Sequence, residues 1–250
     1  MILYKEDWEK HPEAFPDFTT SNTSFLRTAK LYKKMGVENC LFHLALHDEK
    51  LVGVDPHDPN LDDETIDRIV TEVKINPWYF FREVVRLAAT ASPDAIPIRG
   101  NRGNISLYWL FFNHITTMLI QPRQTGKSVS TDALMVYLFG IATVNTDISL
   151  LTKDDSLRVK NVARIKSILE ELPYYLRFKT PRDTYNTEKL SLSRLTNNYV
   201  TNVAQISKKA ALNIGRGMTN AINHIDEIAF VSNIETTLPA LLAASGRQAA

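Results

Sequence analysis

The sequence has one cysteine, no long run of apolar residues and no repeated or low-complexity segment. A single Cys40 excludes an internal disulfide bond and is typical of a protein from a reducing compartment. No apolar run reaches the roughly 20 residues that a membrane-spanning helix needs. The first ten residues become acidic and aromatic too early for a secretory signal. These absences argue against a disulfide scaffold, a membrane-spanning protein and a secreted one.

The composition is that of an ordinary globular protein, with 250 residues, 44% hydrophobic and 23% charged. This length suits one large domain or two small ones. The net charge of +1 hides an asymmetry, because residues 1–98 carry 11 Lys/Arg against 17 Asp/Glu, and residues 153–216 carry 13 against 6. The basic surplus favours contact with phosphate, in a nucleotide or in nucleic acid. A solvated helix face with loop lysines explains it equally well.

Residues 115–136 follow the order that a phosphate-binding P-loop needs. An apolar run over residues 115–120 predicts a strand, a polar turn follows, and the pattern becomes helical after Gly126-Lys127-Ser128. Backbone N–H groups and the dipole at a helix N-terminus favour anions there. In such a loop Lys127 reaches the β- and γ-phosphates, and the Ser128 hydroxyl ligates Mg²⁺. The candidate ATP-binding residues are therefore Gln121, Pro122, Arg123, Gln124, Thr125, Gly126, Lys127 and Ser128.

The first glycine of the usual P-loop spacing is missing, because Gln121 stands in its place. The tripeptide alone also fits a helix N-terminus capped by a small polar residue. The apolar run before the loop and the Arg123-Gln124 pair inside it argue against that simpler interpretation. A second motif is needed to decide.

The N-terminal third predicts mainly helices. Residues 1–25 indicate an irregular arm, and helices are expected over residues 25–35, over residues 38–51 and in a segment from Leu61. His43 and His47 are four residues apart, a spacing that can bind metal on a helix. No third ligand is spaced convincingly, so two histidines on a partly buried helix face are the better interpretation. A further helix is expected over residues 78–91, and another over residues 105–114.

After the loop, strand and helix patterns alternate. The sequence predicts a helix over residues 127–139, a buried strand over 147–151 and an amphipathic helix over 154–172. Residues 189–195 and 199–204 alternate polar and apolar, and Asn197-Asn198 between them predicts a hairpin turn. This order predicts an α/β fold with a mostly parallel sheet that helices cover on both faces.

The second motif lies at residues 221–230, where an apolar strand ends in Asp226-Glu227. In a P-loop NTPase the aspartate of this strand holds the Mg²⁺ shell together with the loop hydroxyl. The adjacent glutamate orients and activates the attacking water. An Asp-Glu pair alone is weak support, but a strand before it and Gly126-Lys127-Ser128 upstream make it strong. We expect His224 to be a sheet-face histidine rather than a catalyst.

These residues together resemble the ATPase region of tailed-phage large terminases, the motors that pump DNA into procapsids. The resemblance rests on Arg-Gln before x-Gly-Lys-Ser, on a helix that ends in Leu-Pro, and on an Arg-Gly pair before an Ile-Asp-Glu-x-Ala-Phe motif. Here these motifs are Arg123 to Ser128, Leu172-Pro173, Arg216-Gly217 and Ile225 to Phe230. They cover roughly residues 76–250. In this family the first motif lacks its leading glycine, as this sequence does at Gln121.

The resemblance implies a Mg²⁺-dependent ATPase of the P-loop class that moves double-stranded viral DNA. It implies an ASCE-type P-loop sheet with a small β-hairpin or lid insertion. It implies a cis arginine finger at Arg123, although that residue could also only anchor the loop. Arg216 could sense nucleotide, act across a subunit boundary or only position its loop.

The partners that the resemblance implies are the portal protein, the small terminase subunit and further copies of the chain in a ring. The expected location is the cytoplasm of an infected bacterium, where the protein docks transiently on the procapsid. A monomer is compatible with the isolated chain.

Two departures from the family pattern bear on this expectation. The family's adenine-contacting segment usually contains a glutamine, but none lies between Ser92 and Ile120. The family also continues with a coupling motif and a nuclease domain, which we expect beyond Ala250, together with any endonuclease activity. The predicted organisation is a mainly helical region over residues 1–75 and an ATPase domain over residues 76–250.

Two alternatives stay open at this point. A helicase-like nucleic-acid translocase would share both motifs and would differ in the sequence that follows. A nucleotide-binding module without turnover would bind nucleotide on a degenerate loop, and the intact Asp226-Glu227 pair argues against it.

Overall fold

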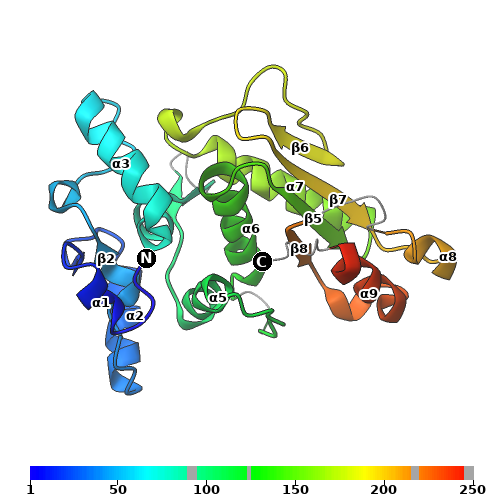
Figure 1. Ribbon diagram of the computed structural model, residues 1–250, viewed down its shortest axis with the longest axis horizontal. Helices are drawn as coiled ribbons and strands as arrows, with labels where there is room; N and C mark the ends of the chain where they lie inside the picture. Colours follow the sequence, from blue (N-terminus) through cyan, green and yellow to red (C-terminus); the bar gives the residue numbers. More distant parts are fainter. Residues whose placement is uncertain (89–94, 123–124, 215–219, 245–250) are drawn as a thin grey trace. The chain divides into compact units, whose positions relative to one another are not determined.

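The computed structural model describes residues 1–88, 95–122, 125–214 and 220–244 (Figure 1). The chain forms two compact units. Unit 1 comprises Met1–Tyr137 with Ser167–Arg177, and unit 2 comprises Leu138–Lys166 with Phe178–Ala250. The sequence-based division after residue 75 stays a prediction.

Unit 1 is mainly helical. Its two pairs of two-residue strands are antiparallel, β1 (Phe15–Pro16) with β2 (Ala45–Leu46) and β3 (Arg86–Leu87) with β4 (Ile96–Pro97). Single helical turns lie at Phe42–Leu44, Glu49–Leu51 and Tyr174–Leu176, and a π-helical turn at Phe80–Val84. The helices are α1 (Asp7–Lys10), α2 (Thr23–Lys34), α3 (Asp63–Ile75), α4 (Pro77–Tyr79), α5 (Arg102–Phe112) and α6 (Lys127–Tyr137).

Local signals explain where these helices begin. The Asp62 carboxylate accepts a hydrogen bond from the Thr65 N–H at 2.7 Å and so caps α3. Asn101 and Asn104 form a reciprocal capping box at the start of α5. The core between the helices is aromatic, and Phe81 stacks on Tyr108 with ring centroids 3.9 Å apart. Helices were expected near residues 25–35 and 105–114 and after Leu61, and these predictions are confirmed.

Three sequence-based predictions in unit 1 are wrong. Residues 38–51 do not form one helix, because the chain there forms two short turns around β2. The helix expected over residues 78–91 stops at Val84, because Val85 is extended and Arg86–Leu87 pairs with Ile96–Pro97; residues 89–91 lie outside the described part. Residues 115–120 form no strand, since they pair with neither strand pair of unit 1, and Ile120 is 86% exposed.

Unit 2 is a mixed α/β unit built on a four-stranded sheet with the order β6-β7-β5-β8. Strand β5 (Asp147–Thr152) pairs in parallel with both β7 (Asn197–Val203) and β8 (Ile222–Ile225), and β6 (Lys189–Leu192) pairs antiparallel with β7. Beside it are α8 (Lys208–Ala211), α9 (Ile234–Ala244) and α7 (Asp155–Glu170), whose last turn belongs to unit 1. The predicted mostly parallel, helix-flanked sheet is therefore confirmed.

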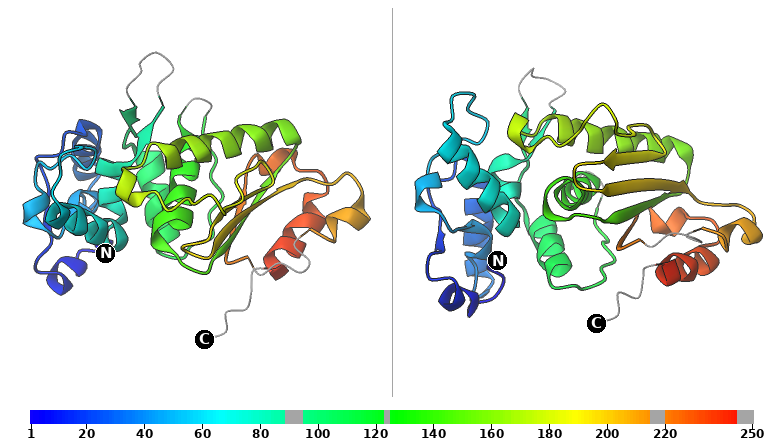
Figure 2. Two further views of the ribbon diagram at one scale, coloured as in Figure 1. Left: turned by 90° about the horizontal axis from the view of Figure 1, so that it is seen from above. Right: turned by 45° about the horizontal axis from the view of Figure 1, so that its top comes forward.

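Helices cover both faces of this sheet. Figure 2 shows α7 along one face and α9 on the opposite face. Val162 and Ile165 of α7 are buried, and Leu151 clusters with Val231 and Leu241 of the α9 side. Because both faces are covered, β5 is buried without interruption from Ile148 to Thr152 instead of alternating between buried and exposed residues.

The predicted hairpin is confirmed, but its turn lies earlier than expected. Residues 193–196 make the turn, and Asn197 begins β7 as a buried residue. Its side-chain amide donates to the carbonyl oxygens of Phe139 and Thr143, both at 2.8 Å. Asn197 therefore links β7 to the π-helical segment Leu138–Ala142 instead of forming a turn.

Candidate functional site

The loop of the first motif ends at the N-terminus of α6 in unit 1. Helix α6 begins at Lys127, and Gly126 before it has φ +79°, a conformation that a side chain disfavours. Lys127 and Ser128 are half-buried on the first turn of an 11-residue helix. The loop residues Arg123 and Gln124 lie outside the described part of the chain.

Hydrogen bonds between residues three or four apart stabilise the described part of this loop. The Thr125 hydroxyl donates to the Pro122 carbonyl oxygen at 2.9 Å and lies 3.1 Å from Gln121 Oε1. The Ser130 hydroxyl donates to the Gly126 carbonyl oxygen at 2.8 Å. No ion pair or hydrogen bond of the Lys127 ammonium occurs within the described residues. This helix start therefore presents a cation and a hydroxyl, the groups that bind a phosphate and its Mg²⁺.

The second motif lies at the carboxyl edge of the sheet in unit 2. Strands β5, β7 and β8 are parallel, so the residues that follow them meet at this edge. Lys153 follows β5, and Asp226-Glu227 follows β8 directly, since Leu151 pairs with Ile225. In open parallel sheets, ligands bind outside the carboxyl ends of the strands.

Asp226 has a buried carboxylate that hydrogen bonds hold in one orientation. Only 6% of the residue is exposed, and its Oδ2 accepts a hydrogen bond from the Asn161 side-chain amide of α7 at 2.9 Å. Arg164 donates in turn to Asn161 Oδ1, at 2.5 Å. The Asp226 N–H also continues the sheet by donating to the Leu151 carbonyl oxygen at 3.0 Å. Such second-layer hydrogen bonds hold a carboxylate in one direction, as metal ligands require.

Glu227 stands in a strained backbone conformation next to a lysine. Its φ of 54° and ψ of 46° are left-handed, which costs a non-glycine residue about 1 kcal/mol or more. Its Oε2 lies 2.6 Å from Lys153 Nζ, and both side chains are about one third exposed. The hydrogen bond that the Lys153 ammonium donates to the Glu227 carboxylate raises the pKa of Lys153. Lys153 also lies over the Phe230 ring, 5.2 Å from its centroid.

Some residues of this edge were not anticipated from the sequence. Lys153 lies two residues after the predicted strand 147–151, so the end of that strand was the signal that could have found it. Asn161 is a fully buried polar residue beside the apolar face of α7. His224 is buried on the sheet, and its Nδ1 lies 3.3 Å from the Tyr199 hydroxyl, as expected for a sheet-face histidine. Arg216 lies outside the described residues.

The predicted site residues are divided between the two units. Lys127 and Ser128 belong to unit 1, and Asp226 and Glu227 belong to unit 2 with Lys153 and Asn161. Among the described residues, no helix is both long and apolar enough to cross a membrane. A comparison of the chain with models of known protein families and with curated protein sequences finds no match.

Proposed function

We propose that this chain is the ATPase region of a DNA-packaging motor of the large-terminase kind. The observation that carries the proposal is the placement of Asp226-Glu227 directly after a strand of a parallel sheet, at its carboxyl edge. A helix N-terminus with Gly126-Lys127-Ser128 supplies the complementary chemistry. In this proposal, unit 2 with its helix-flanked sheet is part of an ASCE-type P-loop fold.

The residues present fit Mg-ATP. Lys127 offers a cation without a carboxylate partner among the described residues, and the loop N–H groups suit the phosphate oxygens. The Ser128 hydroxyl and the Asp226 carboxylate are oxygen ligands of the kind that Mg²⁺ prefers. Bound Mg²⁺ neutralises the charge that develops on the phosphates.

Glu227 is the proposed base. Its carboxylate accepts a hydrogen bond from a water molecule, orients the water oxygen toward the γ-phosphorus and takes up its proton as ADP leaves. The same carboxylate is paired with Lys153 through Oε2, so the water is proposed to bind the second oxygen, Oε1. By the resemblance, Arg123 stabilises the transferred γ-phosphoryl charge, and Arg216 contributes to the site in cis or in trans.

We propose that the motor translocates double-stranded DNA. The basic surplus in residues 153–216 supports this, and Lys208 and Lys209 on α8 are exposed. The resemblance further proposes the portal protein, the small terminase subunit and a ring of copies as partners. By the same resemblance, we propose that the protein acts in the cytoplasm of an infected bacterium and docks transiently on the procapsid.

Phosphate release from ATP, measured with and without double-stranded DNA, tests the proposal. Lys127→Ala should weaken nucleotide binding, and Glu227→Gln should keep binding but lose at least about 100-fold in turnover, the usual contribution of a general base. Exposed residues of the same types provide the controls, Lys74→Ala in unit 1 and Glu188→Gln in unit 2, which should hydrolyse ATP like the unaltered chain.

Three outcomes would count against this proposal or against one of its parts. Retained hydrolysis in Glu227→Gln would remove that residue from the base role. Nucleotide binding without turnover in the unaltered chain would favour a non-catalytic binding module. A chain that binds no Mg-ATP at all would overturn the proposal.

A further inference from the structure

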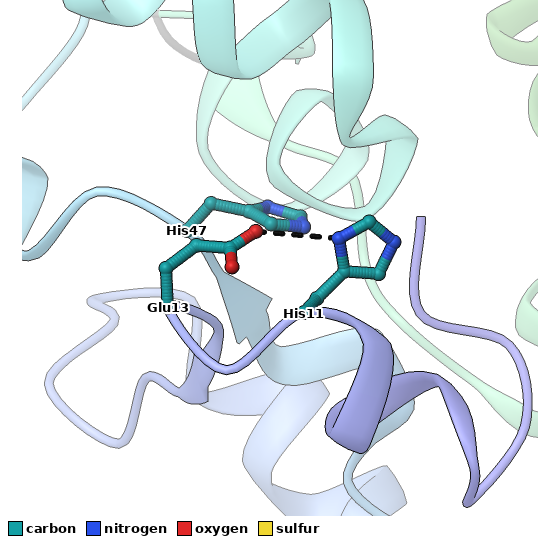
Figure 3. A group of neighbouring side chains, drawn as sticks. All are labelled: His11, Glu13 and His47. Atoms are coloured by element: carbon teal, nitrogen blue, oxygen red, sulfur yellow. Dashed lines mark hydrogen bonds and ion pairs between the residues drawn. The ribbon is translucent and has the colours of Figure 1, made fainter.

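Unit 1 contains a second group of chemistry-bearing side chains, which the proposed function does not use. His11, Glu13 and His47 each offer a potential metal-ligand atom, and these three atoms lie within 4.8 Å of one another. Figure 3 shows the three side chains converging from two segments of the chain. The sequence does not reveal this group, because His11 and His47 are 36 residues apart.

Strand pairing explains why the three residues meet. Phe15 pairs with Leu46 in the antiparallel pair β1–β2. Residues just before β1 therefore lie opposite residues just after β2. Glu13 and His11 precede β1, and His47 follows β2 directly, so the pairing of four residues creates the cluster.

His47 is the most constrained member. Only 6% of its side chain is exposed, and its Nδ1 lies 3.0 Å from Glu72 Oε1. Glu72 is itself buried and also accepts hydrogen bonds from the His47 N–H at 3.2 Å and the Asn76 amide at 2.6 Å. This network fixes the orientation of the imidazole ring and assigns Nδ1 to Glu72.

The other ring nitrogen of His47 has no such partner. Nε2 is buried and makes no hydrogen bond within the described residues. A buried polar atom without a partner costs roughly 1–3 kcal/mol, and such atoms are rare in folded proteins. Figure 3 shows the His47 ring pointing toward His11 and Glu13. The hydrogen bond between His11 Nδ1 and Glu13 Oε1, at 3.2 Å, accounts for those two residues but leaves His47 Nε2 unexplained.

We propose that His11, Glu13 and His47 bind a divalent transition-metal ion of the Zn²⁺ class. Two imidazoles and one carboxylate are a ligand set that Zn²⁺ accepts, whereas Mg²⁺ and Ca²⁺ prefer oxygen ligands alone. Glu72 on Nδ1 of His47 forms the carboxylate–histidine pair that orients a metal-binding imidazole. His47 Nε2 thereby gains the partner that it lacks.

The surroundings of the cluster suit a cation. An open cavity of about 720 Å³ adjoins it, and Glu13, His47 and Glu72 are among its lining residues. Further acidic side chains line the same cavity, namely Asp48, Glu49, Glu64 and Asp67. This excess of carboxylates favours cation entry, and the cavity leaves room for a water as the fourth ligand. The bound metal joins the N-terminal arm to the end of β2.

Calorimetric titration of the untagged chain with ZnCl₂ tests this site. One Zn²⁺ per chain should bind, and His11→Ala and Glu13→Gln should each weaken binding at least about tenfold, because each removes one of three ligands. Both side chains are partly exposed, so neither variant should unfold the chain. His114→Ala, at an exposed histidine of the same unit, is the matched control and should bind Zn²⁺ like the unaltered chain.

Thermal unfolding gives an independent result. Zn²⁺ should raise the melting temperature of the unaltered chain and of His114→Ala, but not that of His11→Ala. A Co²⁺ complex should show the absorption bands of a four-coordinate site. The proposal fails if the untagged chain takes up no stoichiometric Zn²⁺, or if His11→Ala and Glu13→Gln bind as tightly as the control.

Discussion

At the scale of single residues, the most informative position is Glu227. A left-handed glutamate is unfavourable, and the native fold holds it there between the end of β8 and the helical turn Ile228–Phe230. The Phe230 N–H donates to the Glu227 carbonyl oxygen at 2.8 Å and closes this turn. Strain at a residue with reactive chemistry is a pattern expected of functional sites.

Replacing Glu227 by glycine should separate stability from function. Glycine relieves about 1 kcal/mol of backbone strain, and loss of the partly exposed Lys153 pair costs about 0–1 kcal/mol. We expect the free energy of unfolding of Glu227→Gly to stay within about 1 kcal/mol of the unaltered chain, while ATP hydrolysis is lost. Urea unfolding and phosphate release measure the two effects.

Thr196→Gly is the matched control for this change. Thr196 has φ 58° in the exposed turn between β6 and β7 of the same unit. The variant should gain stability in urea and keep full hydrolysis. If Glu227→Gly hydrolyses ATP as fast as Thr196→Gly, the side chain of Glu227 has no catalytic role.

At the scale of secondary-structure elements, α9 contains an internal defect. Pro239 lies in the interior of this helix on an exposed position, where it removes a backbone hydrogen-bond donor. The helix is nevertheless formed, because Leu241 is buried against Leu151 and Val231. Packing on the sheet therefore outweighs the local preference against the helix.

Pro239→Ala should stabilise unit 2. Alanine restores the missing hydrogen bond, and the flexibility that it adds to the unfolded chain offsets part of the gain. We expect the free energy of unfolding to increase by about 1–2 kcal/mol, measured in urea. A decrease would show that the proline fits a kinked α9 that alanine cannot adopt.

At the scale of the whole molecule, ionisable groups in the core of unit 1 couple folding to pH. The Arg82 guanidinium is fully buried and lies 2.7 Å from the Glu83 carboxylate and 3.6 Å from that of Asp17. Burial lowers the pKa of His43 to about 4, with a further contribution from Arg82, while the hydrogen bond to the Phe25 carbonyl opposes the shift. His43 is therefore neutral in the folded state over most of the acidic range.

This pKa shift predicts a loss of stability in mild acid. Between about pH 6.5 and 4 the unfolded chain binds a proton at His43 and the folded chain does not, so stability falls as pH falls. The full effect is about 3 kcal/mol, and His57, whose pKa burial also lowers, adds in the same direction. Unfolding free energies measured across this window check the slope.

His43→Gln should flatten this pH dependence, because the largest titrating contribution is removed. The exposed His114→Ala should leave the slope unchanged. Equal slopes in His43→Gln and the unaltered chain would assign the acid sensitivity to other groups.

Much of unit 2 was predictable because its signals are local. The apolar residues Ile148, Leu150 and Leu151 of β5, the spacing of apolar residues in α7 and the alternation in β6 and β7 are patterns among near neighbours in the chain. The parallel sheet and the position of Asp226-Glu227 at a strand end follow from the order of these elements. Residues 115–120 show the limit of this reasoning, because an apolar run becomes a strand only where a neighbouring strand accepts its hydrogen bonds.

The sequence by itself determined the residue types of the candidate nucleotide site and their order along the chain. Only the tertiary structure decided which side chains meet. Strand register brings Lys153 to Glu227, the packing of α7 brings Asn161 to Asp226, and the pairing of β1 with β2 brings His11 to His47. These contacts join residues that are distant in the sequence, so they depend on how elements pair and pack, which no local pattern specifies.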